Sequence, residues 1–338
     1  MMPYPPSRVD RLMAAVKKQP LPYWLIYLLA GAGETVVLQL IVWVASPATR
    51  FTVQTETAIF PLWTWGVLAW ITLLNQEALA ALHRFQPLLD LEDESKQVLE
   101  YEITVVPARI ELWATPFWLA LFVLIAFTSP VISQHRNNPV LFTAVFLAGA
   151  AAFIIGSAIY SHTAHQLRVV NRLYLHMHKV NMFHLAPVYA FSGLTAQTAI
   201  GFVVLIVLTQ LLYPNGFADA NVLLLYVLQI LLALAVFVLP LRHAHQRLTG
   251  GKQRLQADAA GRMNTILEHL HAAVDERDVA AVDNLNKIMG AITNELNVLD
   301  KIPTWPWPPG TLRAVTTILL VPIVLFLVQA VLKRWLGL

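Results

Sequence analysis

Two glutamates lie inside long apolar stretches of the sequence. Glu34 falls in the middle of LAGAGETVVLQL, and Glu77 lies near the end of a second stretch, in LLNQEALAAL. A charge at bilayer depth costs at least ~2.5 kcal/mol, so each is a candidate proton or cation site, and Glu34 is also a candidate floor for a ligand pocket. The alternative is a glutamate that only joins helices, hydrogen-bonded to a neighbour such as Asn75, Gln76 or Gln39.

Histidine is the second residue type that could carry chemistry. His162 and His165 share one face of a predicted helix. Further histidines lie at neighbouring helix ends: His176, His178, His184, His243 and His245. Metal ligation would require neutral imidazoles that converge on one ion, whereas at a helix end histidine ordinarily favours the helix dipole or lipid headgroups. The chain has no cysteine, so it has no thiolate site, and we predict no metal and no cofactor.

Other chemistry has little support in the sequence. It contains no phosphate-cradling glycine loop, nucleophile elbow or zincin motif, so we predict that the protein is not an enzyme. It contains no basic stripe with interleaved aromatic residues, which argues against nucleic acid as a partner. Gly31, Ala32 and Gly33 beside Glu34 allow close approach of another helix.

Composition defines the elements that must position these residues. The chain is 57% hydrophobic and 13% charged, with a mean hydropathy of +0.59, whereas soluble domains carry about 25% charged residues. A helix needs about 20 apolar residues to cross a bilayer. Seven stretches meet this requirement, at about 21–46, 57–82, 112–133, 139–161, 187–213, 220–241 and 311–333. We predict an all-α, polytopic membrane protein whose first partner is the lipid bilayer.

The basic residues predict the orientation of these spans. Most basic residues lie in the N-terminal segment and in the connections predicted on the same side of the membrane: Arg8, Arg11, Lys17, Lys18, Arg84, Lys96, Arg109, Arg168, Arg172, Lys179, Arg242, Arg247, Lys252, Arg254, Arg262, Arg277, Lys287 and Lys301. Only Arg50, Arg136, Lys333 and Arg334 lie on the other side, and Arg313 lies at the mouth of the last span. By the positive-inside rule the N-terminus is cytoplasmic and the C-terminus is outside. The predicted location is the cell membrane, with multiple passes.

Four regions follow from the pattern. Residues 1–20 predict a cytoplasmic amphipathic helix at the membrane surface, and residues 21–245 a six-helix transmembrane domain with cytoplasmic helix extensions. Residues 246–304 carry two apolar stripes at helical spacing, with Asp278 as the N-cap of the second, which predicts an antiparallel helical hairpin. An acidic elbow at 88–103, around Glu92, is predicted to lie at the membrane surface. Residues 305–338 form a Trp/Pro joint and the seventh span.

The joint and the last span are the region in which we expect coupling. Pro303, Pro306, Pro308 and Pro309 prevent a continuous helix, and Trp305 and Trp307 beside them are predicted to anchor the joint at the membrane surface and to couple the hairpin to the span. The candidate pore-lining residues of the span are Arg313, Thr317, Val321, Val324, Leu325 and Gln329. A ring of such helices from several subunits would form an apolar constriction that gates by dewetting. The alternative is a helix that simply faces lipid.

The predicted architecture resembles the insect odorant and gustatory receptor superfamily and its prokaryotic relatives. The stretches NMFHLAPVYAFSGLTAQTA, FVLPLRHAHQRL and DKIPTWPWPPGTLR are also similar to uncharacterised seven-span prokaryotic proteins. Thr317 and Gln329 are loose counterparts of a threonine–tyrosine start and a glutamine–phenylalanine finish in the last span of the insect receptors, here without the aromatic partners. The resemblance implies a ligand-gated cation channel, assembled as a homotetramer around the last span. It also implies a small-molecule pocket in the outer leaflet, with Trp63, Trp65 and Tyr160 as aromatic walls.

Two other function classes remain open at this point. A membrane sensor or scaffold would signal through the hairpin to a cytoplasmic partner. A small-molecule transporter would use Glu34, although no inverted repeat is evident in the sequence.

Overall fold

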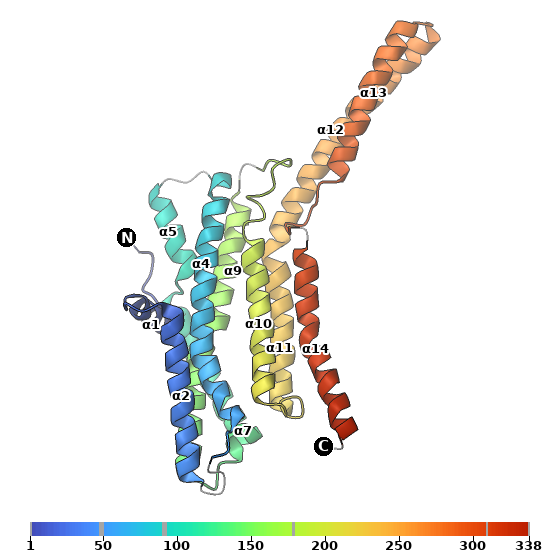
Figure 1. Cartoon of the computed structure of the whole chain (residues 1–338). Coiled ribbons are helices and arrows are strands. Elements are labelled where there is room, and N and C mark those ends of the chain that lie inside the picture. The colour runs from blue at the N-terminus through green and yellow to red at the C-terminus, as the bar shows by residue number, and fades with distance from the viewer. Residues whose placement is uncertain (1, 47–50, 90–92, 178–179, 309, 337–338) are drawn as a thin grey trace.

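The computed structural model describes residues 2–46, 51–89, 93–177, 180–308 and 310–336. These residues form helices and no strand, apart from one isolated β-bridge between Pro6 and Pro107. The helices form an elongated bundle, from one end of which α12 and α13 project (Figure 1). We call this end the hairpin end and the opposite end the far end. Arg50, Glu92, His178, Lys179 and Pro309, which the sequence analysis singled out, lie outside the described residues.

The predicted all-α class with seven membrane spans is confirmed. The stretches long and apolar enough to cross a bilayer are Tyr23–Ala45, Thr55–Leu88, Ala108–Thr128, Pro139–Leu175, Ser192–Leu212, Ala220–Asp275 and Thr311–Leu332. The protein is therefore an integral membrane protein by the length and composition of its helices. Several spans run on beyond the bilayer thickness as continuous or nearly continuous helices.

The elements in chain order are α1 (Arg8–Lys17), α2 (Tyr23–Ala45), η2 (Thr55–Ala58), α3 (Ile59–Pro61), η3 (Leu62–Gly66), α4 (Val67–Phe85), η4 (Gln86–Leu88), α5 (Asp93–Thr104), α6 (Ala108–Thr128), α7 (Pro130–Ser133), α8 (Pro139–Gly156), α9 (Ala158–Leu175), α10 (Ser192–Leu212), α11 (Ala220–Val238), η5 (Leu239–Leu241), α12 (Arg242–Asp275), α13 (Val279–Asp300) and α14 (Thr311–Leu336). The fifth span begins at Ser192, five residues later than predicted, because residues 187–191 form turns.

Helix α1 is amphipathic, as its sequence predicts, but its apolar face does not lie in lipid. Val9, Met13 and Val16 are buried in the main core of the bundle, and the Thr72 hydroxyl of α4 contacts the Met13 sulfur at 3.6 Å. Periodicity reveals that one face is apolar but does not reveal what covers it. The apolar face of α1 is thus covered by the bundle, and the position of the helix at the membrane surface stays a prediction.

Helix α10 is the most buried of the spans and packs against α4, α11 and α14. Its close approach to α4 requires Gly201, because a Cβ at this position would lie 2.1 Å from the indole of Trp70. By contrast, α14 packs chiefly against α10 and lies at the edge of the bundle (Figure 1). The most buried span thus packs directly against one of the two least buried spans.

Replacing Gly201 with alanine is expected to destabilise the protein, because the Trp70 ring must move to admit the methyl group. Overpacking of this kind costs about 1–3 kcal/mol. The thermal unfolding midpoint in detergent measures the effect. Gly33→Ala is the matched control, since no atom lies within 4 Å of a Cβ built there, and its midpoint should not fall. Equal midpoints for Gly201→Ala and the unmodified chain would contradict the packing argument.

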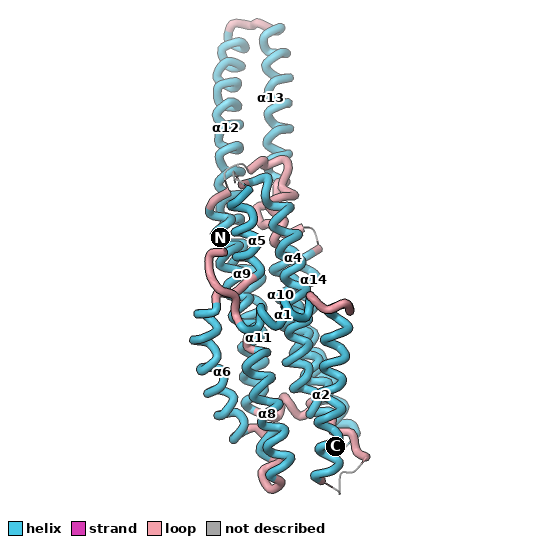
Figure 2. The backbone as a smooth tube through the Cα atoms, turned by 90° about the vertical axis from the view of Figure 1, so that its left-hand side faces the viewer, coloured by secondary structure: helices cyan, strands magenta, loops and turns pink. Residues whose placement is uncertain are grey.

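Helices α12 and α13 lie side by side and antiparallel beyond the bundle (Figure 2). The buried residues between them are Ala259, Ile292 and Leu299. The turn between the helices ends at Asp278, whose carboxylate accepts the backbone N–H of Ala281 as an N-cap. Two helices joined by so few buried residues leave much apolar surface uncovered: Val274, Val279, Ile288 and Val298 are each at least 46% exposed.

Candidate functional site

Glu34 faces a tryptophan on the second span. Its Oε2 accepts a hydrogen bond of 2.7 Å from Nε1 of Trp65, and the Trp65 side chain packs against α2 at Gly31, one turn earlier, where a Cβ would lie 3.6 Å from it. Neither Glu34 nor Trp65 lines the main cavity of the bundle. Glu34 therefore does not form the floor of this cavity, and Trp65 does not form part of its wall.

Trp65 belongs to η3, a single π-helical turn that interrupts the second span. Single π turns inside longer helices are frequent at functional sites. The same turn carries Trp63, whose Nε1 donates to the Thr209 hydroxyl of α10 at 3.0 Å. One turn thus presents two indoles to two different helices. Gly156 permits this arrangement, because a Cβ there would lie 2.8 Å from the carbonyl oxygen of Trp63.

Trp63 lines a cavity of about 130 Å³ in the far-end half of the bundle. The walls come from α3, η3, α6, α7, α8, α9, α10 and α11 and are mainly aromatic and aliphatic. The aromatic lining residues are Phe60, Trp63, Trp118, Phe153, Tyr160, Tyr213 and Tyr226. None of the lining residues, all of which the structure describes, is charged. Buried apolar pockets of this kind are the usual form of small-molecule sites.

Tyr160, in one cavity wall, lies at the centre of a row of three stacked rings. Its ring is 4.7 Å from that of Trp118 at an interplanar angle of 16°. On its other side the ring of Phe202 is 5.7 Å away at 21°. Of the three aromatic walls that the family resemblance implied, Trp63 and Tyr160 line the cavity and Trp65 does not.

Most polar groups of the cavity are paired within the protein. The Ser129 hydroxyl bonds the Asp219 carboxylate at 2.5 Å, and the Thr209 and Ser157 hydroxyls donate to backbone carbonyls one turn earlier. Two atoms stand apart. The Oε1 of Gln229 and the hydroxyl of Tyr226 are buried and have no hydrogen-bond partner among the residues that the structure describes. Buried polar atoms are nearly always paired, so these two mark places where a ligand group fits.

The cavity is connected to the last span by a short series of contacts. The Tyr226 ring is 5.6 Å from Phe217, and Phe217 is 4.8 Å from Phe326 of α14. Beside these rings, Nε2 of Gln210 donates to Oε1 of Gln329 at 2.8 Å. A change at the cavity wall can therefore reach α14 through directly packed side chains.

The six candidate pore residues fall on two faces of α14. Arg313, Thr317, Val321 and Val324 are exposed, and Leu325 is half-buried. Gln329 instead lies on the face that carries the buried residues Val315 and Pro322 and that packs toward the bundle. The spacing of 315, 322 and 329 places these three on one side of a helix, with the exposed candidates on the other side.

At its other end α14 begins after a stack of four rings. Trp305 and Trp307 are parallel at 4.6 Å. His245 of α12 stacks on Trp305 at 4.1 Å, and Phe237 of α11 stacks on Trp307 at 4.7 Å. Nδ1 of His245 also lies 3.0 Å from the carbonyl oxygen of Thr304. The two tryptophans thus attach the joint to the corner between α11 and α12, a contact that the sequence did not predict.

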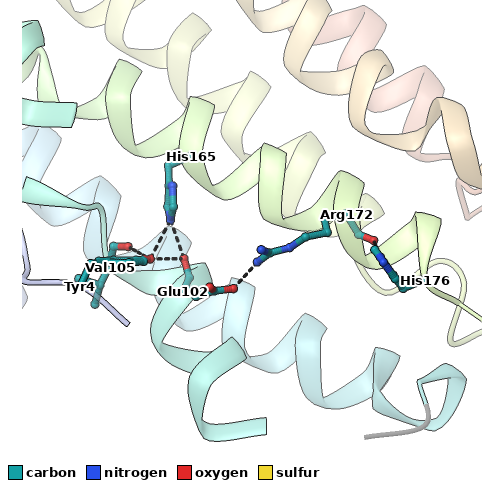
Figure 3. Close-up of polar contacts among 6 residues, drawn as sticks. All are labelled: Tyr4, Glu102, Val105, His165, Arg172 and His176. Atoms are coloured by element: carbon teal, nitrogen blue, oxygen red, sulfur yellow. Dashed lines mark hydrogen bonds and ion pairs between the residues drawn. The ribbon is translucent and has the colours of Figure 1, made fainter. Parts of the chain in front are cut away.

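The paired histidines of α9 help to cap another helix. Figure 3 shows Nε2 of His165 directed at the carbonyl oxygen of Glu102, 2.9 Å away, and the Tyr4 hydroxyl at the carbonyl of Val105, also 2.9 Å away. A carbonyl only accepts, so Nε2 of His165 carries the proton. The side chains of Arg172 and Glu102 form an ion pair beside them.

His162 and Gln166 continue this capping. Their side-chain nitrogens lie 3.3 Å from the carbonyl of Thr104 and 3.1 Å from that of Ile103. Side chains of α9 therefore donate hydrogen bonds to the last carbonyls of α5, which lack partners within α5 itself. Within the described ranges no group of three His, Asp or Glu side chains could hold a metal ion.

Glu77 is the second of the two glutamates singled out in the sequence. Its Oε1 accepts from the guanidinium of Arg84 at 2.9 Å, and its side chain is 23% exposed. It lies outside the cavity lining. The pair joins two turns of α4 itself, at the hairpin end, and not two different helices.

The carboxylate of Asp10 makes the docking of α1 dependent on pH. It accepts from the Ser7 hydroxyl at 2.7 Å and from the Val106 N–H at 2.9 Å, and burial raises its pKa above the ordinary value of 3.8. At pH values between the ordinary pKa of 3.8 and the raised pKa of the folded state, the folded chain binds more protons than the unfolded chain. Docking of α1 therefore weakens as the pH rises through that window. Hydrogen exchange of α1 amides, corrected for the intrinsic rate, should show lower protection at pH 7 than at pH 4. Asp10→Asn should remove the dependence, and a dependence that persists would contradict it.

Glu34 is expected to hold the π turn in place through Trp65. Glu34→Ala removes the acceptor and should lower the affinity of any cavity ligand about 3- to 10-fold, on the scale of one hydrogen bond. Glu34→Gln keeps an acceptor and should bind nearly as the unmodified chain does. A loss of binding in Glu34→Gln equal to that in Glu34→Ala would instead indicate that the charge itself is required.

Comparison with protein-family models, curated proteins and solved structures gives no match to this chain.

Proposed function

We propose that this integral membrane protein is a homo-oligomeric, ligand-gated cation channel. A small molecule binds in the cavity lined by Trp63, Tyr160 and Tyr226, and α14 lines the pore. The observation that carries the proposal is the contact series from Tyr226 through Phe217 to Phe326, because it joins a ligand-sized cavity to the last span. Cation selectivity and a tetramer are what the resemblance to the insect receptors implies.

The attachment of α14 supports its role as the moving element. It is fixed at the far end by Phe326 and Gln329 and at the hairpin end by the ring stack, while its middle packs chiefly against α10. The exposed face is almost wholly apolar. The hydroxyls of Thr316 and Thr317 on it donate to backbone carbonyls of their own helix and so are already paired. Several copies of that face around one axis would make a constriction that dewets when narrow.

The uncovered surface of α12 and α13 supports assembly through the hairpin. We assign the hairpin end to the cytoplasm, because the basic residues identified in the sequence concentrate in the segments of that end. There the exposed valines and isoleucine of the hairpin would pack against the hairpins of other subunits. Burial of these side chains is worth about 25 cal/mol per Å².

Purified full-length protein tests the proposal. Native mass spectrometry in detergent should give a single oligomer, and reconstitution into planar bilayers should give discrete current steps. Replacing sodium with a large organic cation should abolish the inward current if the channel selects small cations. A monomer that yields no current in bilayers containing verified protein would overturn the proposal.

A further inference from the structure

The polar groups of the cavity define the chemistry of its ligand, an inference that rests on the ligand-binding role proposed above. The geometry points to a small, flat aromatic molecule that carries a hydroxyl or N–H group, of the phenol or indole class. Three features of the cavity support this class: its two unpaired polar atoms, its aromatic walls and its size.

The unpaired amide oxygen of Gln229 requires a hydrogen-bond donor on the ligand, whereas the Tyr226 hydroxyl can either donate or accept. Gln229 is 3% exposed, and its Nε2 already donates to the Tyr160 hydroxyl at 3.0 Å. Its Oε1 is left without a partner and, as an amide oxygen, can only accept. Tyr226 is 4% exposed, and its hydroxyl has no partner either. The two residues are three apart on α11 and therefore share one helix face.

The walls favour a ring over an aliphatic chain. The stacked rings of Trp118 and Tyr160 and the indole of Trp63 line the same space, and aromatic pairs gain more than their buried area alone supplies. The volume of about 130 Å³ is close to that of an engineered apolar cavity of ~150 Å³ that binds benzene. It admits one ring with a small substituent, or a fused bicycle, and excludes a long acyl chain.

The lining also restricts the charge of the ligand. No charged residue is among the described lining residues, and the Asp219 carboxylate behind Ser129 already accepts from that hydroxyl and from the backbone N–H of Asn221. An ammonium or carboxylate group in the cavity would therefore lose its hydration without a lining charge to pair with. A neutral donor avoids this penalty. The competing explanation is an ordered water on Gln229 and Tyr226, and it predicts that the cavity has no preference for a donor.

A comparison of phenol with toluene separates these explanations. Dissociation constants are measured on the full-length protein in nanodiscs by calorimetry, with the fluorescence of the cavity tryptophans as a second readout. The ratio of the toluene constant to the phenol constant cancels the general affinity of each ring for apolar surroundings when variants are compared. In Gln229→Leu this ratio is expected to fall about tenfold, the scale of one buried hydrogen bond.

Controls and further variants make each result decisive. Gln76→Leu changes an exposed glutamine outside the cavity and should leave the ratio unchanged. Ala152→Phe fills the cavity and should abolish binding of both rings. If Gln229→Leu does not fold, as judged by its thermal unfolding, Tyr226→Phe replaces it, with Tyr27→Phe as its matched control.

The outcomes also separate this inference from the proposed function. One outcome is that the ratio of the toluene constant to the phenol constant in Gln229→Leu stays within twofold of the unmodified value while Ala152→Phe still blocks both rings. This result overturns the donor requirement and leaves the cavity as a ligand site. Failure of both rings to bind the unmodified protein at millimolar concentration, or binding that survives Ala152→Phe, overturns this inference together with the ligand-binding role.

Discussion

Val324→Trp is expected to reduce the single-channel conductance of the reconstituted protein at least about tenfold. Val324 is 56% exposed and lies on the face of α14 turned away from the bundle. In an oligomer arranged around this face, every subunit would add one indole to the same level of the pore. Bulk at an apolar constriction opposes hydration and thus ion passage. Conductance is measured from current steps in planar bilayers at matched oligomer content.

The control for this variant is Val37→Trp on α2. Val37 is 55% exposed, nearly the same as Val324, and also lies in a membrane span. It should leave the conductance unchanged, because we expect α2 to face lipid. If Val324→Trp has the conductance of the unmodified channel while Val37→Trp lowers it, α14 does not line the pore and α2 becomes the candidate.

Trp307→Ala is expected to lower the ligand-evoked current about tenfold without changing ligand binding. Trp307 takes part in two of the three stacked pairs of the joint, with Trp305 and with Phe237. Each aromatic pair contributes about 0.5–1.5 kcal/mol beyond its area, so the substitution should release the joint from α11. The hairpin end of α14 would then move independently of the helices that form the cavity. Macroscopic current at saturating phenol, divided by the amount of reconstituted protein, measures the loss.

The matched control for the joint is Trp335→Ala. Trp335 lies at the opposite end of α14 and is 83% exposed, so its removal should have little effect on the current. Phenol affinity in nanodiscs should be the same for both variants. A Trp307→Ala protein with full current would indicate that the stack is only an anchor, and one with lost phenol binding would indicate a general disruption of the bundle.

Hydropathy predicted the membrane spans well because it reflects a requirement on each segment alone. Every predicted apolar stretch lies within or overlaps one of the seven helices. The errors occur where a partner from elsewhere in the chain decides the outcome. Met13, on the apolar face of α1, contacts Thr72 of α4, and the spacing of Val9, Met13 and Val16 contains no information about that partner.

The candidate site was harder to predict because its lining comes from eight elements spread along the chain. Glu34 was a candidate because it is a charged residue in a span, yet its hydrogen-bond partner is Trp65, which lies outside the cavity lining. Gln229, in LLLYVLQILL, is a neutral polar residue in a span, and the reasoning applied to Glu34 would have identified it. Sequence periodicity could also have placed Gln329 and Val324 on different faces of the last span. Gln329 lies at heptad spacing from Val315 and Pro322, which are buried in the structure, and Val324 does not.

The π turn η3 acts as a one-residue insertion in the second span. A π turn holds one residue more than an α turn, so winding Leu62–Gly66 as regular α-helix with no residue removed would rotate everything before it by about 100° relative to α4. Phe60 would then leave its present position in the cavity wall, although no wall residue itself had been substituted. The shape of the cavity can thus change through the phase of a helix, and a chain of this architecture can acquire a different ligand preference by a shift in register.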